Sequence, residues 1–344
     1  MASYSRLNIE DTTVSTDKVV TNAWSADTDT LTTFFTSSTQ AVTTNPTSQG
    51  NFFLDIYKDD IKLTSSVTSQ FSVAYGHKAG SGSVPFTNVA GALGNSSTKC
   101  IYNQYRQLVY GDENSNFIFN GFEPTDVWVI NVARGSYKHS LKGGSLNMVL
   151  KDGTNTFHLT DDSVTTTGSA TITNLGRQFN LVSGSDGVMS GSTLNQTGAE
   201  SGSYGFVYPE AGVIVFNGEA LRNVTPAFWA SGSSATKQEK AHQMYKAFKD
   251  TAGATFQVDC EERVSSQYMF VRVKNSEFNY SSNPSYVDTN GNLNNTTMTD
   301  SPITYITTVG LYNDDNNLLA VAKLSQPLKK DFTTEALIRI KLDY

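Results

Sequence analysis

The side chains that most often carry out chemistry are few in this sequence and widely separated. The four histidines are His77, His139, His158 and His242. No two of them stand four residues apart, as a helical zinc site requires. His158 precedes Asp161 and Asp162 closely enough for a two-ligand metal site, but an ordinary surface histidine is the simpler interpretation. His242 falls on the polar side of a predicted helix, where we expect it to be solvated.

Three segments rich in glycine and serine were compared with known catalytic and phosphate-binding patterns. A serine nucleophile needs a sharply turned Gly-x-Ser-x-Gly segment. Gly80–Ser83 and Gly184–Gly187 come nearest, and neither has that spacing. The segment 94–99 lacks the second glycine that precedes the lysine of a phosphate-binding loop. None of the three is therefore expected to hold a nucleophile or a phosphate.

Two groups of acidic residues are candidate carboxylate or calcium sites. The first is Asp259 with Glu261 and Glu262, and the second is the Asp-Asp-Asn-Asn run at 314–317. The second group lacks the spaced acidic residues and the distal glutamate of a calcium loop. A tight hairpin turn explains it better, because Asn and Asp tolerate left-handed backbone geometry. The sequence therefore predicts no catalytic, cofactor-binding or metal-binding site, and no enzyme.

The bulk composition excludes several classes of protein. The 344 residues carry a net charge of −7, and no run of Lys and Arg could neutralise a series of phosphates, so direct nucleic-acid binding is not expected. No apolar stretch approaches the roughly 18 residues of a membrane-spanning helix. Residues 1–20 lack the apolar core of a signal peptide, which predicts synthesis in the cytoplasm. We expect Cys100 and Cys260 to be free and buried.

Hydrophobic patterning predicts a mainly β (α+β) fold, with antiparallel sheets, one or two short helices and long polar loops. The predicted strands are 52–57, 71–77, 126–132, 145–150, 157–159, 179–182, 206–208, 213–216, 256–258, 268–273, 305–312, 318–323 and 336–342. Alternation places Phe71, Val73 and Tyr75 on one face of 71–77. In 336–342 it places Ile338, Ile340 and Leu342 on one face and Arg339 and Lys341 on the other. Hairpins are expected at 145–159 and 206–216, and a break at Pro327.

Two segments have helical spacing. The first is predicted over 236–250, with an apolar stripe of Ala241, Met244, Tyr245 and Phe248. Ser234 or Thr236 can cap its start, and Gly253 can end it. A shorter helix is predicted over 98–109, with a stripe of Ile101, Gln104, Tyr105 and Leu108.

The predicted organisation has three parts. Residues 1–50 have sparse apolar anchors, which suit either an extended arm lying along another subunit or a loop-rich edge of the main domain. A β-rich lobe is expected over 51–195, and a second one, which contains the longer helix and the C-terminal strands, over 196–344. Long polar loops are expected at 80–95 and 275–302, and such loops normally bind something or move.

The C-terminal strands resemble a module of tailed-phage tail and baseplate proteins. Residues 303–314 contain Val309-Gly310-Leu311-Tyr312, then 318–323 carry Leu-Leu-Ala-Val-Ala-Lys, and residues 326–330 read Gln-Pro-Leu-Lys-Lys. We expect Gly310 where close packing leaves no room for a side chain. The upstream blocks 52–57, 70–82, 99–108 and 208–216 are similar to a structural protein of contractile-tailed phages that infect marine cyanobacteria.

This resemblance implies a virion structural protein, a tail or baseplate component located in the virion. The expected partners are other virion proteins, with several copies assembled around the tail axis. It transfers no catalytic residue. Three alternative functions are a receptor- or glycan-binding fibre module, a neck or head-decoration protein, and a wall-degrading enzyme. The binding module predicts that Tyr280 and Tyr286 are exposed.

Overall fold

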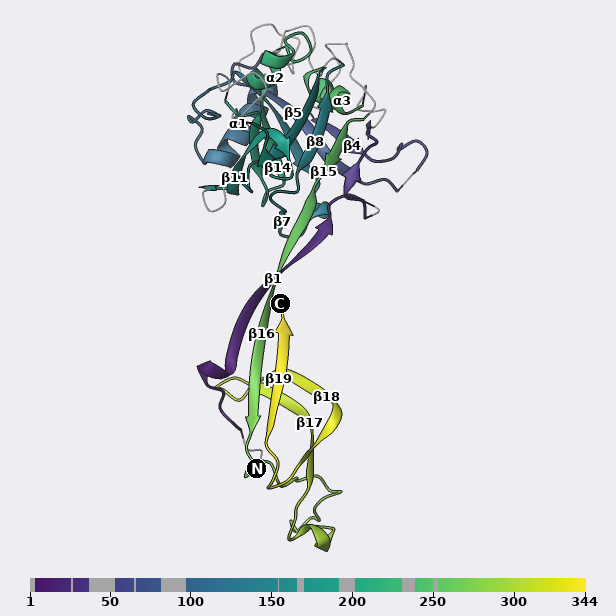
Figure 1. Ribbon diagram of the computed structural model, residues 1–344, viewed down its shortest axis with the longest axis vertical. Helices are drawn as coiled ribbons and strands as arrows, with labels where there is room; N and C mark the ends of the chain where they lie inside the picture. Colours follow the sequence, from purple (N-terminus) through teal and green to yellow (C-terminus); the bar gives the residue numbers. More distant parts are fainter. Residues whose placement is uncertain are drawn as a thin grey trace. The chain divides into compact units, whose positions relative to one another are not determined.

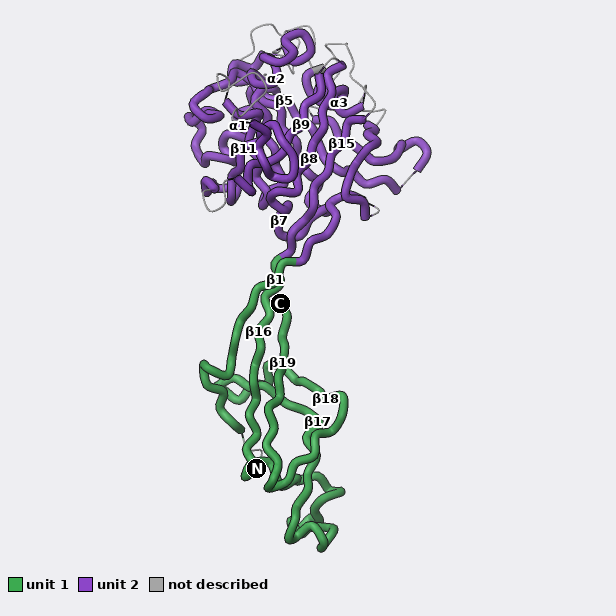
Figure 2. Tube along the Cα trace, viewed as in Figure 1, with its two compact units in different colours: residues 1–18, 263–344 green, residues 19–262 purple. Residues whose placement is uncertain are grey.

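The chain forms two compact units, which are described separately. The computed structural model describes residues 4–25, 27–36, 53–64, 66–81, 97–153, 155–165, 170–191, 202–230, 239–249 and 253–344. Unit 1 consists of residues 1–18 and 263–344, and unit 2 of residues 19–262 (Figure 2). The chain passes between the units within the strands β1 (Thr12–Asn22) and β16 (Asp259–Val273).

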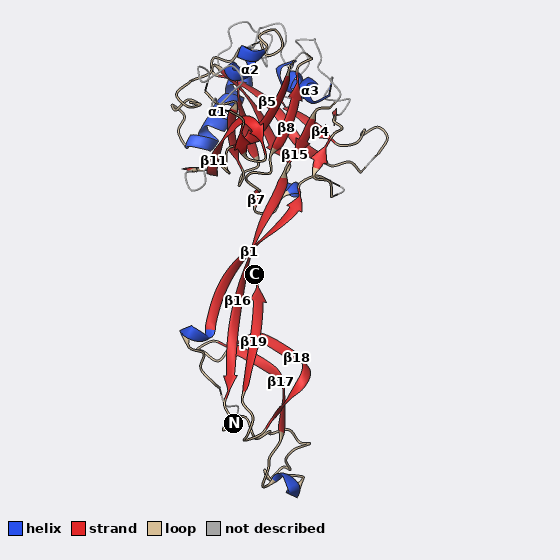
Figure 3. Cartoon of the chain, viewed as in Figure 1, coloured by secondary structure: helices blue, strands red, loops and turns tan. Residues whose placement is uncertain are grey.

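The mainly β fold class is confirmed (Figure 3). Unit 2 is built on one large antiparallel sheet whose strands lie in the order β2 (Thr30–Leu31), β15 (Thr255–Gln257), β8 (Asn147–Lys151), β9 (Thr156–Asp161), β11 (Gly176–Ser185), β13 (Gly205–Tyr208), β14 (Val213–Asn217), β6 (Asp126–Val132), β5 (Ser69–His77), β4 (Phe53–Tyr57) and β3 (Phe35–Thr36). The short strands β10 (Thr171–Thr173) and β12 (Val188–Met189) also pair with β11. β7 (Ser140–Leu141) pairs with β16.

Strand alternation divides the core of unit 2 between the two faces of this sheet. In β5, Phe71, Val73 and Tyr75 join one apolar cluster, as predicted, whereas Ala74 joins a second cluster on the other face. The helix α3 (Glu239–Lys249) packs in the first cluster and α1 (Ser97–Tyr110) in the second. Figure 1 labels both helices beside the strands of unit 2. A Cβ at Gly76 would come within 2.9 Å of the Tyr102 backbone, so α1 approaches β5 closely.

The predicted helices form, but the shorter one buries a different face. In α3, Ala241, Met244, Tyr245 and Phe248 are buried as predicted. The proposed N-terminal caps Ser234 and Thr236 lie outside the described residues, and Gly253, the proposed stop, adopts φ +93°. In α1, the buried residues are Ser97, Thr98, Tyr102, Tyr105 and Val109, whereas Leu108 is 44% exposed. The predicted stripe is therefore wrong at Gln104 and Leu108. The buried face carries Tyr102 and Tyr105, whose rings are apolar and whose hydroxyls accept hydrogen bonds from the backbone N–H of Phe117 and from Nδ2 of Asn131.

A third α-helix, α2 (Gly218–Val224), was not predicted. Its seven residues are too few for a periodic apolar pattern. The side chain of Asn217 caps it by accepting hydrogen bonds from the backbone N–H groups of Glu219 and Ala220.

Residues 23–36 belong to unit 2 and do not form a free arm. Trp24, Leu31 and Phe34 are buried in the first cluster, and β2 and β3 pair with β15 and β4. This favours the edge-of-domain alternative for these residues, while 37–52 lie outside the described residues. A variant that lacks the first 50 residues would also lose the core side chains Trp24, Leu31 and Phe34, so its behaviour would report on the stability of unit 2 as well as on an arm.

The two units do not follow the predicted boundaries at residues 50 and 195. The stretch around 195 follows β12 and precedes β13, and β11 and β13 are paired neighbours in one sheet, with Leu181 opposite Gly205. The stretch rich in glycine and serine is therefore a connection within unit 2, because its two ends lie side by side.

Unit 1 is built from two small sheets. One has the order β1-β16-β19, where β19 is Ala336–Asp343, and the other pairs β17 (Thr304–Tyr312) with β18 (Leu318–Lys330). Ile338 and Ile340 are buried and Arg339 and Lys341 exposed, which confirms the predicted alternation of the last strand. Short 3-10 helices occur at Ile9–Asp11 and Thr296–Met298, and a third, Arg134–Ser136, lies in unit 2.

The predicted break at Pro327 is wrong, because β18 continues through it. The register shifts here, with Thr308 opposite Lys323 but Ile306 opposite Leu328. Proline is tolerated in strands at such bulges because its missing N–H then removes no ladder hydrogen bond.

The long loop at 275–302 is held by a buried lysine. Lys330 is 0% exposed, and its Nζ donates to the carbonyl oxygens of Asn275 (2.8 Å) and Asp331 (2.7 Å) and to Oδ1 of Asn279 (2.7 Å). These three acceptors satisfy the three donors of the ammonium group. The β17–β18 hairpin thereby fixes the start of the loop.

We predict that Lys330→Met loosens residues 275–279 in unit 1. The substitution keeps the length of the side chain but removes three charge-assisted hydrogen bonds, each worth about 1.5–3 kcal/mol. Hydrogen exchange measured by mass spectrometry should show faster exchange across this segment. Lys329→Met is the matched control, because Lys329 is exposed and pairs only at the surface with Asp331. Equal exchange in both variants would contradict the assignment.

Candidate functional site

The structure does not assemble the metal site considered at His158. His158 is exposed, and strand alternation in β9 turns its side chain away from the buried Asp161. Asp161 accepts hydrogen bonds from the backbone N–H groups of Gly144 and Ser163, all at 3.0 Å. Burial raises the pKa of its carboxyl. Among the described residues, no group of three His, Cys, Asp or Glu side chains could hold a metal ion.

The acidic groups singled out in the sequence have structural partners. Asp259 pairs with Lys142 at 3.5 Å and Glu262 with Lys138 at 2.6 Å. The run at 314–317 is confirmed as the hairpin turn of β17 and β18. Oδ1 of Asn313 accepts from the N–H groups of Asp315 and Asn317, and Asn316 adopts φ +62°.

The segments rich in glycine and serine were not expected to hold a nucleophile or a phosphate, and the two cysteines were expected to be free and buried. Residues 184–187 turn β11 back onto β12, while residues 82 and 83 of the segment 80–83 lie outside the described residues. Both cysteines are free, as predicted. Cys260 is buried, and burial raises its pKa to about 11. The prediction of burial is wrong for Cys100, which is exposed because α1 turns Tyr102 and Tyr105 to the sheet instead.

A buried charge network that the sequence did not reveal lies beside His77. Asp126 is 0% exposed, and its carboxylate accepts hydrogen bonds from the guanidinium of Arg222 (2.8 and 3.3 Å) and from the hydroxyl of Tyr75 (3.1 Å). Arg222 also pairs with Glu219 at 2.7 Å. The network connects α2 with β5 and β6. A charge pair of this kind holds its elements in one arrangement, because separating the two groups would leave a buried charge without a partner.

His77 lies at the end of β5 near this network. Its Nδ1 accepts hydrogen bonds from the backbone N–H groups of Ala79 (3.1 Å) and Ser81 (3.2 Å), so that nitrogen carries no proton. Burial lowers the pKa of His77, with a smaller opposing effect of Asp126 and a further lowering by Arg222. The geometry is that of a histidine held neutral as a hydrogen-bond acceptor in a chain turn.

We predict that His77 weakens unit 2 in acid. Because its folded pKa is below its unfolded value of about 6.5, its stabilising contribution is present above that pH and is lost as the pH falls through the folded pKa. Thermal unfolding at pH 8 and pH 5 should show a smaller drop for His77→Gln than for the unaltered protein. The exposed His158→Gln is the control, and equal pH dependence in both variants would refute the role of His77.

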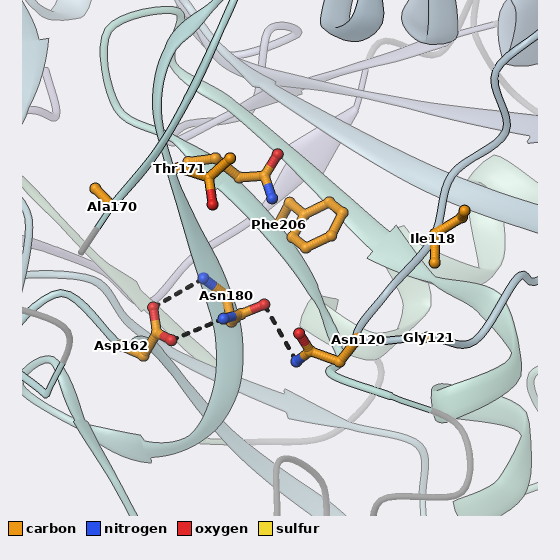
Figure 4. Close-up of a pocket in the computed structure, with 9 residues that line it drawn as sticks. Ile118, Asn120, Gly121, Asp162, Ala170, Thr171, Asn180 and Phe206 are labelled. Carbon is orange, nitrogen blue, oxygen red and sulfur yellow. Dashed lines mark hydrogen bonds between the residues drawn. The ribbon is translucent and has the colours of Figure 1, made fainter.

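A hollow of about 280 Å³ lies on the α1 side of the sheet, over β10, β11 and β13 (Figure 4). Its polar lining residues are Asn120, Asp162, Thr171, Gln178 and Asn180. Its other lining residues are Ile118, Gly121, Ala170 and Phe206. Charged groups are represented by one carboxylate, and most of the polar lining consists of amides.

Strand register explains why these side chains meet. Thr171 lies opposite Gln178 across β10 and β11, and Asn180 lies opposite Phe206 across β11 and β13. Gln178 and Asn180 are two residues apart, so they share a face of β11. The remaining wall comes from the segment 118–121, which is anchored where Phe119 packs on Phe206 at 4.5 Å between ring centroids.

The amides of this pocket are oriented by hydrogen bonds. Oδ1 and Oδ2 of Asp162 accept from the backbone N–H and from Nδ2 of Asn180, both at 2.8 Å, and Oδ1 of Asn180 accepts from Nδ2 of Asn120 at 3.4 Å (Figure 4). Oε1 of Gln178 accepts from the hydroxyl of Tyr208 at 3.0 Å. The pocket therefore presents a fixed pattern of donors and acceptors.

From the sequence, Asp162 was considered only as a metal ligand, and the other pocket residues were not predicted to form a site. One local signal was present, since polar Gln178 and Asn180 alternate with buried Phe179 and Leu181. That alternation shows a polar strand face, but the wall at 118–121 is about 60 residues away in sequence and carries no comparable signal.

Comparisons with protein-family models, curated proteins and solved structures found no match to the chain.

Unit 1 carries an exposed apolar surface at the turn end of its hairpin. Tyr312, Leu318, Leu319 and Val321 form this hairpin-end patch, and they are 43%, 52%, 69% and 60% exposed. Ala320 and Ala322, which alternate with them, face the small core of the unit. A Cβ at Gly310 would lie 2.9 Å from the Tyr312 ring, but Gly310 is exposed and this tyrosine can move, so close packing at this glycine stays a prediction.

The core beneath this patch is small. Only Val273, Leu311, Ile338 and Ile340 are fully buried among the apolar residues of its cluster. Two-stranded sheets are marginal by themselves and gain stability from what covers them.

Among the described residues, no helix has the length and hydrophobicity needed to cross a membrane.

Proposed function

We propose that the protein is a structural subunit of a tailed-phage virion, a tail or baseplate component that assembles through contacts between subunits. The supporting observation is the hairpin-end patch, where four large apolar side chains are exposed at the turn end of β17 and β18, with Tyr312 opposite Leu318 in the register. Single exposed apolar residues are common on proteins, but a contiguous group marks an interaction surface.

The exposed strands of unit 1 support the same proposal. Within the described part of the chain, β17 and β18 form a sheet of their own, so neither has a second neighbouring strand. Unpaired strand edges are templates for pairing with another chain. Both features lie in the C-terminal strands, which are the segment that resembles phage tail modules. Multiple copies would strengthen such modest contacts, because each added contact becomes effectively intramolecular.

We predict that Leu319→Asp combined with Val321→Asp weakens self-association. Each substitution places a charge where an aliphatic side chain would be buried, and burial of one such side chain is worth about 1.5–3 kcal/mol. The dissociation constant should rise at least about tenfold, measured by sedimentation velocity across a concentration series. Val188→Asp, at a similarly exposed valine of unit 2, is the control. A chain that is monomeric at all concentrations, or an equal effect of the control, would contradict the patch as the contact.

The virion location is tested separately. Mass spectrometry of purified phage particles and gold labelling of unit 2 should place the protein in several copies on the tail. Its absence from mature particles would refute the proposed function, whatever the behaviour of the purified chain.

A further inference from the structure

The pocket over β10, β11 and β13 has a lining suited to hydroxyl groups. The side chains of Asn120, Thr171 and Gln178 are uncharged and can both donate and accept hydrogen bonds. Because Oε1 of Gln178 already accepts from Tyr208, its NH2 group is what Gln178 offers to a ligand. A hydroxyl group also donates and accepts, so adjacent hydroxyls on one ligand match adjacent amides and hydroxyls on the protein.

The single carboxylate has a structural role. Asp162 is 7% exposed, and its two oxygens hold Asn180 by the hydrogen bonds at 2.8 Å. It orients an amide and is poorly placed to recognise a cationic ligand. An anionic ligand would lack a positive partner, because no Lys, Arg or His lines the pocket in the described part of the chain. Charge therefore favours a neutral ligand.

The remaining lining supplies apolar contact. The ring of Phe206 and the side chains of Ile118 and Ala170 line the hollow beside the amides (Figure 4). Small-molecule sites combine such apolar walls with a few oriented polar groups. At about 280 Å³, the pocket is at the lower end of the roughly 300–1,000 Å³ of ligand pockets. It fits one six-membered ring and no extended ligand.

We propose that this pocket binds a single neutral sugar ring, with ring hydroxyls on Asn120, Thr171 and Gln178 and a C–H face on Phe206. The proposal uses unit 2 alone. It is independent of the assembly role, which rests on the hairpin-end patch of unit 1.

The proposal is tested by nuclear magnetic resonance on the full isotope-labelled chain. The probes are glucose, galactose, mannose and N-acetylglucosamine, with sialic acid and glucosamine as charged counterparts. At least one neutral sugar should shift the side-chain amide signals of Asn120, Gln178 and Asn180 in a saturable way at millimolar concentration, and the charged sugars should bind more weakly. If no neutral sugar shifts these signals, or if a charged sugar binds more tightly, the proposal is wrong.

Two substitutions separate this site from binding elsewhere. Gln178→Ala and Asn120→Ala should each weaken binding about five- to tenfold, as expected for one lost hydrogen bond. Asn114→Ala is the control, because Asn114 is an exposed amide of unit 2 outside the pocket, and it should leave affinity unchanged. Asn120 is itself exposed, so its variant is expected to fold even if Gln178→Ala does not. Binding that survives both substitutions would place the sugar elsewhere and overturn the proposal.

Discussion

The structure of unit 2 depends on one constraint, which is that its central strands must be covered on both faces. All but one residue of β6 is buried, and β14 is buried along its whole length. A strand with no solvated face needs a layer on each side. Here α3 supplies one layer and α1 the other, and α2 is tied to β6 by the Asp126–Arg222 pair. The segment 117–122 extends the α1 layer, with Phe117 and Phe119 stacked toward Phe206.

The pocket lies where the apolar layer on the α1 side of the sheet ends and the face of β11 on that side becomes polar. Along β11, the α1 side carries the amides Gln178 and Asn180, whereas their neighbours Phe179 and Leu181 remain in the opposite core. Polar groups that are partly removed from water need partners. Asp162 and Tyr208 provide them, and this fixes the amides in place. The same feature that ends the apolar layer therefore produces an oriented binding surface.

Unit 1 has a smaller apolar core than unit 2. Its apolar cluster has few fully buried members, and a buried lysine holds the adjoining loop through three oxygen atoms. Such an arrangement leaves large apolar side chains at the hairpin end in contact with solvent. The proposed assembly role and the sugar pocket thus rest on separate units and on separate kinds of interaction, one apolar and one polar.

The sequence by itself determined the local features of this protein. Alternation in 71–77 and 336–342, the hairpins at 145–159 and 206–216, and the Asn-rich turn after Tyr312 all follow from neighbours a few residues apart. Only the tertiary structure decided which face α1 buries, how residues 23–36 enter the core and which side chains line the pocket. Those features depend on strand register and packing between distant segments, where Asn180 meets Asn120 across 60 residues, and no local period records such contacts.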